Sequence, residues 1–419
     1  MTGTWTQVAT LPRGYAPTAY TSAVLADGRL AITGGEYNVG GQYQLQLTNL
    51  GAIYNPWTNN WISLGHPAGW QYIGDSPGTV LRGGQFFVGQ KLTKQAAYLD
   101  PKTLKWMIVK TAGKADFNAE EGFTLLPDGS VLTTDVKDAP NSERYIPSKS
   151  VWITAGSTIV DLHSPTSVRG CLKYGPRPED CYYPPGEIGP SVLRPDGTVL
   201  ATGSGSGASG SGVGHTAIYH TSGRLTGTWT AGPDFPNGDN AGDSFAVLLP
   251  SGNVLVFGVS GNLYEFTGSK FIPTGGASGS PLLLPTGQVL ILGNGLNLYT
   301  PQGKPQPAWA PQVKSLSTRL THGRTYTVAG TQFNGLSQAM SFGDEFQNAT
   351  NYPLVRITNR ATGHVTYART HDHSSMGVAT GATIVSTYFD VPARMDTGSS
   401  VLEVVANGIA SVPITVTVQ

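Results

Sequence analysis

One seven-residue pattern recurs along this chain and limits the folds that are open to it. Each copy joins two apolar runs through a tight turn that ends in glycine, which predicts a β-hairpin. The copies are LADGRLA at 25–31, LRGGQFF at 81–87, LPDGSVL at 126–132, RPDGTVL at 194–200, LPSGNVL at 249–255 and LPTGQVL at 284–290. A hairpin cannot bury both of its faces alone, so six spaced copies predict a repeat architecture.

The spacing of the repeats indicates which architecture. Successive turn glycines, from Gly28 to Gly287, lie between 35 and 68 residues apart. That distance suits a four-stranded unit with variable loops, the blade of a β-propeller. Six hairpins predict six blades, and the alternative is a seventh, degenerate blade within 136–184. Because TGTWTQVATLP near the N-terminus is similar to LTGTWTAGPDFP at 225–236, we expect residues 4–9 to close the ring as the outer strand of the last blade.

The hairpin pattern ends at about Pro311. The sequence beyond it alternates apolar and polar residues in runs such as SSVLEVVANG and SVPITVTV, which is typical of a β-sandwich. We therefore predict an all-β chain with a propeller at 1–310 and an immunoglobulin-like, E-set-type sandwich at 311–419.

Composition excludes some classes of function. The 26 basic and 26 acidic side chains balance, so the total charge does not favour a nucleic-acid partner. No apolar run is long enough to cross a bilayer. Cys171 and Cys181 flank a short, polar, turn-rich segment, which predicts a disulfide. Together with charged residues of only 12%, this favours a protein that is secreted or periplasmic. We expect the protein to be a monomer.

A resemblance to a known family adds to this interpretation. The segments LADGRLAITGGEYN and YNPWTNNW resemble kelch repeats, and a kelch-like propeller followed by a β-sandwich resembles galactose oxidase and its relatives. In that family a loop of the C-terminal domain carries a copper-binding histidine through the propeller pore. The stretch ARTHDHSSMGVATG at 368–381 is similar to that loop. The resemblance implies that His371, or else His373, is a pore histidine.

The rest of the family's copper site does not transfer. The positions of its tyrosine–histidine pair contain GASGSP here, and the crosslinking cysteine has no match. Tyr20 is near the place of the radical tyrosine but is one residue out of register. Copper is therefore less favoured as a cofactor than a divalent cation such as calcium, and the cofactor stays unknown.

Acidic residues recur just before the predicted inner strands. Counting back nine positions from the turn glycines reaches or adjoins a carboxylate in four of the six repeats: Asp75, Glu120 or its neighbour Glu121, Glu187 and Asp243. In a propeller these positions surround one end of the central channel. We expect the carboxylates to face a common space, within about one water of His371 or His373. They either cap loops, bind a cation, or perform acid–base chemistry.

These features favour a carbohydrate or other small polyhydroxylated ligand. Trp70 and Tyr72, with Trp57 and Trp61, could form a sugar-stacking platform beside Asp75, or else belong to the core between blades. Whether the chain is an enzyme stays open. The first hypothesis is hydrolysis or elimination at a glycan by the acidic residues. The alternatives are a non-catalytic carbohydrate-binding propeller and a metal-dependent oxidase.

Overall fold

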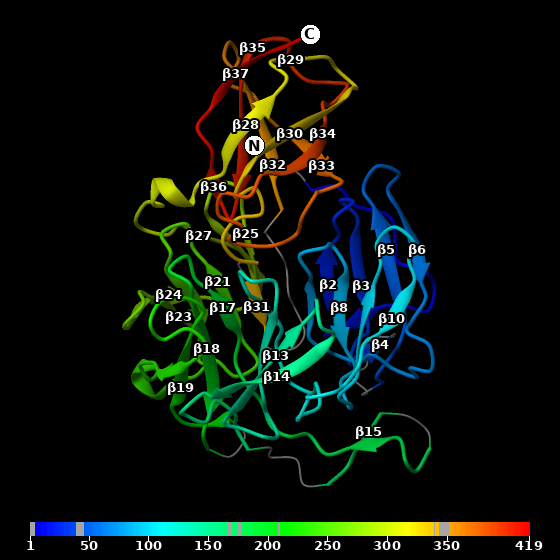
Figure 1. Cartoon of the computed structure of the whole chain (residues 1–419), viewed down its shortest axis with the longest axis vertical. Helices are drawn as coiled ribbons and strands as arrows, with labels where there is room; N and C mark the ends of the chain where they lie inside the picture. Colours follow the sequence, from blue (N-terminus) through cyan, green and yellow to red (C-terminus); the bar gives the residue numbers. More distant parts are fainter. Residues whose placement is uncertain are drawn as a thin grey trace.

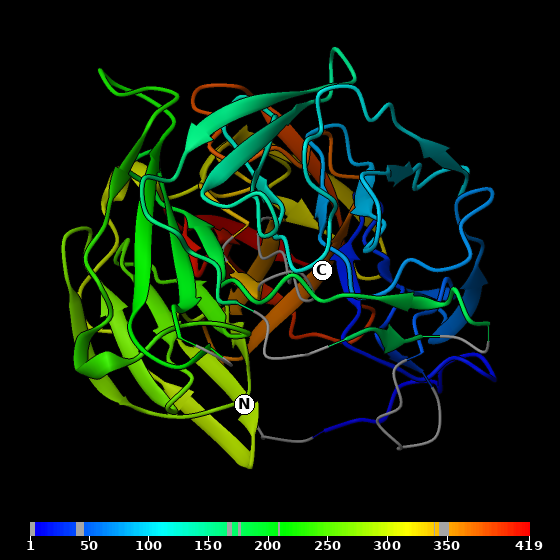
Figure 2. The same ribbon diagram turned by 90° about the horizontal axis from the view of Figure 1, so that it is seen from below.

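The computed structural model of this chain describes residues 5–38, 46–165, 170–174, 177–207, 210–338, 340–342 and 352–419. Six antiparallel sheets surround a central axis and form a six-bladed β-propeller (Figures 1 and 2). A C-terminal β-sheet lies against one face of the propeller (Figure 1). The predicted all-β class and the six blades are confirmed.

Five blades contain four strands each, which run in chain order from the channel outward. The strands are β2 (Thr21–Val24), β3 (Leu30–Thr33), β5 (Gly51–Asn55) and β6 (Asn60–Leu64) in the first blade; β7 (Gly78–Val80), β8 (Phe86–Gly89), β9 (Ala96–Leu99) and β10 (Trp106–Ile108) in the second; β11 (Thr124–Leu125), β12 (Val131–Thr134), β13 (Asn141–Ile146) and β14 (Val151–Ser157) in the third; β17 (Ser191–Leu193), β18 (Thr198–Gly205), β19 (Gly214–His220) and β20 (Trp229–Ala231) in the fourth; and β21 (Phe245–Leu248), β22 (Val254–Phe257), β23 (Asn262–Phe266) and β24 (Phe271–Gly276) in the fifth.

The sixth blade has three strands among the described residues: β25 (Ser280–Leu283), β26 (Val289–Gly293) and β27 (Gly295–Tyr299). We expected residues 4–9 to complete this blade as its outer strand. For residues 5–9, which the structure describes, that prediction is wrong. Ala9 instead lies against the first blade, where it accepts a hydrogen bond from the Trp61 indole at 2.9 Å. Its backbone nitrogen donates to Asn59 at 3.0 Å. Thr4 lies outside the described residues.

The repeated hairpin turns form as the sequence predicts. In the third blade the Leu126 nitrogen donates to the Ser130 oxygen at 2.8 Å, and the Gly129 nitrogen donates to the Leu126 oxygen at 2.9 Å. Gly129 has a φ of 85°, a conformation that glycine adopts without steric cost. Asp128 accepts the Ser130 N–H at 3.0 Å. The Pro-Asp-Gly sequence therefore determines the turn directly.

Aromatic and aliphatic side chains from neighbouring blades pack together. Phe87 of the second blade stacks on Phe123 and Tyr145 of the third, with ring centroids 5.2 and 4.7 Å apart. Trp152 is buried in the same cluster. Burial of each such side chain stabilises the fold by roughly 1.5–3 kcal/mol. The insertion at 136–184 contributes β13 and β14 to the third blade, so it does not hide a seventh blade.

The C-terminal strands form one mixed sheet that curls around its own core. They are β28 (Gln312–Leu316), β29 (Arg319–Leu320), β30 (Thr325–Thr331), β32 (Leu354–Asn359), β33 (Val365–His371), β34 (Val385–Asp390), β35 (Gly398–Ala406), β36 (Ile409–Ala410) and β37 (Ile414–Val418). The parallel pair β29–β37 ends the sheet. This half-barrel replaces the two separate sheets of the predicted sandwich.

The C-terminal domain contacts the hairpin-turn face of the propeller and also fills the channel. The His373 nitrogen donates to the Ala26 oxygen in the first hairpin turn, and the Met376 nitrogen donates to the Arg82 oxygen in the second, at 2.8 and 2.9 Å. Strand β31 (Met340–Phe342) pairs with β21, the inner strand of the fifth blade. Gln338 accepts a hydrogen bond from Thr79 on β7 at 2.6 Å. The starts of the inner strands therefore lie at the opposite face.

Two further points concern the environment of the chain. Cys171 and Cys181 form the predicted disulfide, with their Cα atoms 5.5 Å apart. A disulfide is typical of an oxidising compartment. Among the described residues we find no helix with the length and hydropathy needed to pass through a bilayer.

Candidate carboxylate site at the propeller mouth

The face where the inner strands begin, here called the mouth, contains a cavity of about 460 Å³. Asp75, Glu120, Glu187 and Asp243 all line it, each from a different blade. Glu36, which follows β3, is a fifth carboxylate in the lining. Glu120 and Asp243 adopt positive φ angles of 61° and 47° just before β11 and β21. Two of the repeats thus present their acidic residues to this space with the same unusual backbone conformation.

A buried lysine neutralises part of this charge. Lys91, which follows β8, is 1% exposed. Its ammonium nitrogen pairs with Asp75 and lies 2.8 Å from the Glu120 carboxylate. Burial raises the pKa of Asp75 well above its ordinary value, and Lys91 opposes that rise. Burial likewise raises the pKa of Glu36. Five carboxylates face one ammonium, so the cavity favours positive charge and protons.

Glu187 and Asp243 are joined by a hydrogen bond between their side chains. Burial, with the nearby charges of Glu120 and Asp243, raises the pKa of Glu187 to about 11. Asp243 is exposed to the cavity; desolvation by the surrounding walls and the charge of Glu120 raise its pKa only to about 6, because the hydrogen bond from Glu187 favours the ionised form. At neutral pH one proton therefore lies on Glu187, while Asp243 is charged. Two acids with opposite protonation states are the usual requirement for acid–base chemistry.

The segment between the third and fourth blades covers part of the mouth. It contains the short pair β15 (Leu172–Lys173) and β16 (Cys181–Tyr182), visible at the end of the molecule opposite the C-terminal sheet (Figure 1). Arg177 donates to Gln71 of the second blade at 2.8 Å. Tyr182 lines the cavity, and its ring lies 5.7 Å from the Lys91 ammonium. The disulfide therefore constrains a loop that shapes the site.

The sequence did not reveal Glu36, Lys91 and Tyr182 as site residues. The repeat nevertheless contained a signal for two of them. The second strand of a hairpin ends beside the start of the first strand, so residues just after the second strand also lie at the mouth. Glu36 and Lys91 follow β3 and β8 at two or three residues. Tyr182 comes from an insertion, for which the repeat gives no register.

Glu121 does not line the mouth cavity. It points into the third blade, where both of its carboxylate oxygens lie 2.9 Å from the Lys114 ammonium. The chain turns at Glu120, whose φ is 61°, and directs the two neighbouring side chains to different sides. Glu120 and Glu121 therefore belong to two different clusters.

The predicted meeting of the histidines with the acidic residues is wrong. His371 lies at the opposite face of the propeller, where it contacts Asp372 at 2.7 Å and Asp390 at 3.3 Å. Its ring packs on Trp57 in the outer turn of the first blade, with centroids 5.4 Å apart. His373 contacts Thr387 at 2.8 Å, and burial lowers its pKa to about 4. The same loop does enter the propeller, but with Met376 and Val378, which are buried among the blades.

The predicted aromatic platform also does not form. Trp70 is 3% exposed and belongs to the core of the first two blades. Tyr72 instead packs on Tyr174 of the covering segment, at 5.2 Å between ring centroids. Tyr20 lies in a small cluster with Tyr15 and Ile32, and burial raises its pKa. None of these three side chains lines the cavity described above.

The likeness of this chain to known proteins is structural and distant. No protein-family model matches the chain, and no curated protein matches it. Its structure is similar to that of a fungal alcohol oxidase of the AA5 family in complex with copper, at a TM-score of 0.48 and 14% identity, over 96% of this chain and 85% of the other. It is also similar to virginiamycin B lyase from Staphylococcus aureus, at a TM-score of 0.40 and 10% identity, over 92% of this chain and 99% of the other in the complex with quinupristin.

The copper site implied by the resemblance does not fit these residues. Copper sites of that kind use imidazole ligands, whereas the described lining of the cavity offers carboxylates, Tyr37 and Tyr182 but no histidine. The histidine loop contacts the other face. No step of the chemistry below is therefore assigned to copper.

Proposed function

We propose that this protein is an exported enzyme that hydrolyses a glycosidic bond of a neutral or basic carbohydrate at the propeller mouth. The observation that carries the proposal is that Glu187 and Asp243 converge from two blades on one cavity of about 460 Å³; pKa values of about 11 and about 6 favour a protonated Glu187 and an ionised Asp243 there at neutral pH. That volume accommodates one or two sugar rings, within the usual range of about 300–1,000 Å³ for ligand pockets.

The negative charge of the cavity favours hydrolysis of a glycosidic bond over elimination. Glycosidic bonds break through a transition state that carries positive charge on the sugar ring. Fixed carboxylates such as Glu120 stabilise that charge more than they stabilise the neutral substrate. Elimination from an acidic glycan instead needs a cation to neutralise the substrate's carboxylate. Lys91 is already paired with Asp75 and Glu120, so hydrolysis is favoured over elimination.

The roles of the residues follow from their protonation. Glu187, hydrogen-bonded to the ionised Asp243, donates its proton to the oxygen of the leaving sugar, and Glu120 accepts a proton from the attacking water on the other side. A pair that is directly hydrogen-bonded is closer than the roughly 5–9 Å that carboxylates flanking a sugar adopt. The pair therefore shares one proton as a unit, and Glu120 is the carboxylate that opposes it across the substrate.

A cation is not required at Asp75 and Glu120 in this scheme. Oxygen-rich clusters suit calcium, but the Lys91 ammonium already lies between these two carboxylates. A non-catalytic carbohydrate-binding propeller is the alternative outcome of the experiment below.

The experiment is a screen of the purified chain against neutral, amino-substituted and acidic oligosaccharides, with products detected by mass spectrometry. Glu187→Gln and Asp243→Asn should each lower kcat by about 10²–10⁴-fold. Asp128→Asn, which changes a carboxylate in a hairpin turn, is the matched control and should retain full activity. Turnover that survives both mouth substitutions contradicts the proposal. A sugar that binds by calorimetry but is not cleaved by the wild type indicates a binding module.

The pH profile gives a second measurement. Activity should rise as Asp243 loses its proton near its pKa of about 6. It should then stay high through neutral pH and fall only in strong alkali, where Glu187, with a pKa of about 11, loses its proton. A profile with its maximum well below pH 5 would be inconsistent with an ionised Asp243.

A further inference from the structure

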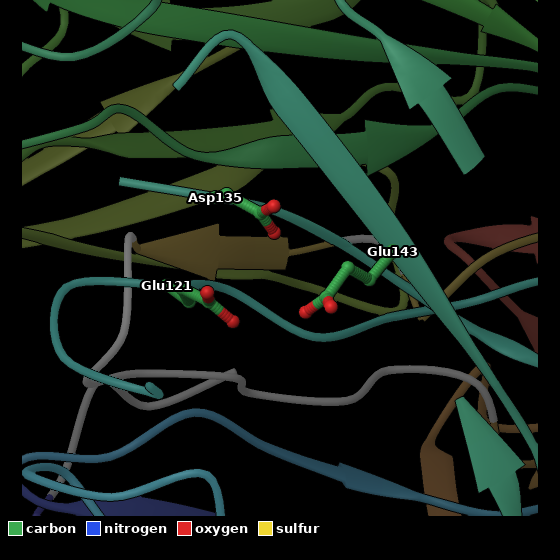
Figure 3. Close-up of side chains that lie close together, drawn as sticks. All are labelled: Glu121, Asp135 and Glu143. Atoms are coloured by element: carbon green, nitrogen blue, oxygen red, sulfur yellow. The ribbon is translucent and has the colours of Figure 1, made fainter. Parts of the chain in front are cut away.

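A second acidic cluster lies inside the third blade. Glu121 precedes β11, Asp135 follows β12 and Glu143 lies on β13. The three side chains point toward one another (Figure 3), and one carboxylate oxygen from each lies within 4.8 Å of the others. They are 0%, 3% and 3% exposed. Three neighbouring strands thus direct their acidic residues into one closed space.

Two of the three carboxylates are well satisfied. Lys114, itself buried, lies 2.9 Å from both oxygens of Glu121 and 2.6 Å from one oxygen of Glu143. Thr133 donates to Glu121 at 2.8 Å. The Ala115 nitrogen donates to the other oxygen of Glu143.

Asp135 differs from its neighbours. Neither of its carboxylate oxygens has a hydrogen-bond partner among the described residues, although the side chain is 3% exposed. A buried polar group without a partner costs about 1–3 kcal/mol, and more when the group is charged. The cluster also contains three carboxylates and one ammonium, which leaves a formal excess of two negative charges. A buried excess of that size is balanced either by bound protons or by a cation.

We propose that Glu121, Asp135 and Glu143 bind one divalent cation of the calcium type inside the third blade. Calcium binds carboxylate oxygens at about 2.3–2.6 Å, so two ligand oxygens on opposite sides of the ion lie up to about 5 Å apart. One oxygen of each carboxylate lies within 4.8 Å of the others, so all three can contact one ion. The cation takes the two free oxygens of Asp135 and one oxygen each of Glu121 and Glu143, and the Lys114 ammonium moves from between these two carboxylates to the oxygens that the ion leaves free.

An ion in this cluster also stabilises the backbone at the mouth. Glu120, with its strained φ of 61°, directly precedes Glu121. A cation that links the ends of β11, β12 and β13 fixes the backbone from which Glu120 enters the cavity. The proposal goes beyond the glycosidase proposal, because binding of the ion can be measured without a substrate.

Terbium luminescence tests the site in the intact protein. The Lys114 ammonium lies 5.2 Å from the centre of the Trp152 ring, so an ion in this cluster is close to an indole that can sensitise terbium emission. The chain, treated with EGTA and desalted, should bind one terbium ion with strong emission on tryptophan excitation, and calcium should displace it. Calcium at 100 times its Kd should raise the melting temperature by about 5 °C.

Variants assign the ion to the cluster. Asp135→Asn keeps the shape of the side chain and should weaken terbium binding at least 10-fold, and Glu143→Gln provides a second test if Asp135→Asn folds poorly. Asp243→Asn, which changes an exposed carboxylate of the mouth, is the control and should leave binding unchanged. Absence of sensitised emission and of a calcium-dependent melting shift in the wild type overturns the proposal. Unchanged affinity in Asp135→Asn also overturns it, as does a loss confined to Asp243→Asn.

Discussion

Replacement of Lys91 by methionine tests the charge balance of the mouth most directly. The substitution keeps the length of an apolar side chain and removes the ammonium that contacts Asp75 and Glu120. At 2.8 Å and an effective dielectric constant of about 20, one such pair attracts with about 6 kcal/mol before desolvation is counted. Because all three groups are buried, removal of one partner should cost about 3–5 kcal/mol of folding free energy at neutral pH.

The loss should depend on pH, and its sign follows from protonation. Burial already raises the pKa of Asp75, and Lys91 is the group that lowers it. Without Lys91 the pKa of Asp75 rises further above its value in the unfolded chain. A carboxyl group with a raised folded-state pKa binds its proton more tightly in the native state, so stability falls as the pH rises through that window. Lys91→Met should therefore be least destabilised near pH 5 and most destabilised near pH 8.

Thermal unfolding followed by tryptophan fluorescence at pH 5 and pH 8 measures both effects. At pH 8 the melting temperature should fall by about 10 °C. Lys94→Met, which removes an exposed lysine from the same loop, is the control and should change the melting temperature by less than about 2 °C. A Lys91→Met variant as stable as the wild type at pH 8, or equally destabilised at both pH values, would refute the argument that Lys91 neutralises the mouth.

Three further outcomes are expected. His371→Ala should leave turnover unchanged and lower the melting temperature by a few degrees, because His371 links Trp57 to the C-terminal domain. Loss of turnover would show that His371 takes part in catalysis. Met376→Ala should cost about 2–5 kcal/mol in urea unfolding, because it empties a fully buried position among the inner strands; a cost below about 1 kcal/mol would contradict that packing. Mass spectrometry without reductant should find Cys171 bonded to Cys181, and replacement of both by serine should cost at most about 3 kcal/mol for a loop of this length; two thiols that are alkylated without reductant would exclude the bond.

The hairpins were predictable because their determinants are local. A Pro-Asp-Gly turn such as that at Gly129 sets the chain reversal within four residues. Closure of the ring depends instead on contacts between distant segments. The N-terminal sequence resembles an outer strand, yet Ala9 pairs with Trp61 of the first blade. The edge to which a segment attaches depends on tertiary packing, which sequence similarity between segments does not report.

The candidate site was also predictable where its determinants are local and not where they depend on contacts between blades. Equivalent positions before the inner strands led to Asp75, Glu120, Glu187 and Asp243, and these do line one cavity; their catalytic role stays a prediction. Lys91 escaped notice because its partners lie on two different blades. The pairing of Glu187 with Asp243 depends on a distance between blades, which no local pattern gives.

The position of the C-terminal domain explains why the described part of the site contains carboxylates, Lys91 and tyrosines but no histidine. The domain contacts the hairpin-turn face and directs β31 along the inner strand of the fifth blade, so its histidines remain at that face. The mouth at the other face draws its side chains from the ends of strands that the repeat supplies, and the repeat places acidic residues there. Such a site works at neutral pH only if burial and mutual repulsion hold some of these groups protonated. The contrast between Glu187 and Asp243 is the result of that crowding, because either carboxylate alone in water would be ionised and would serve only as a base.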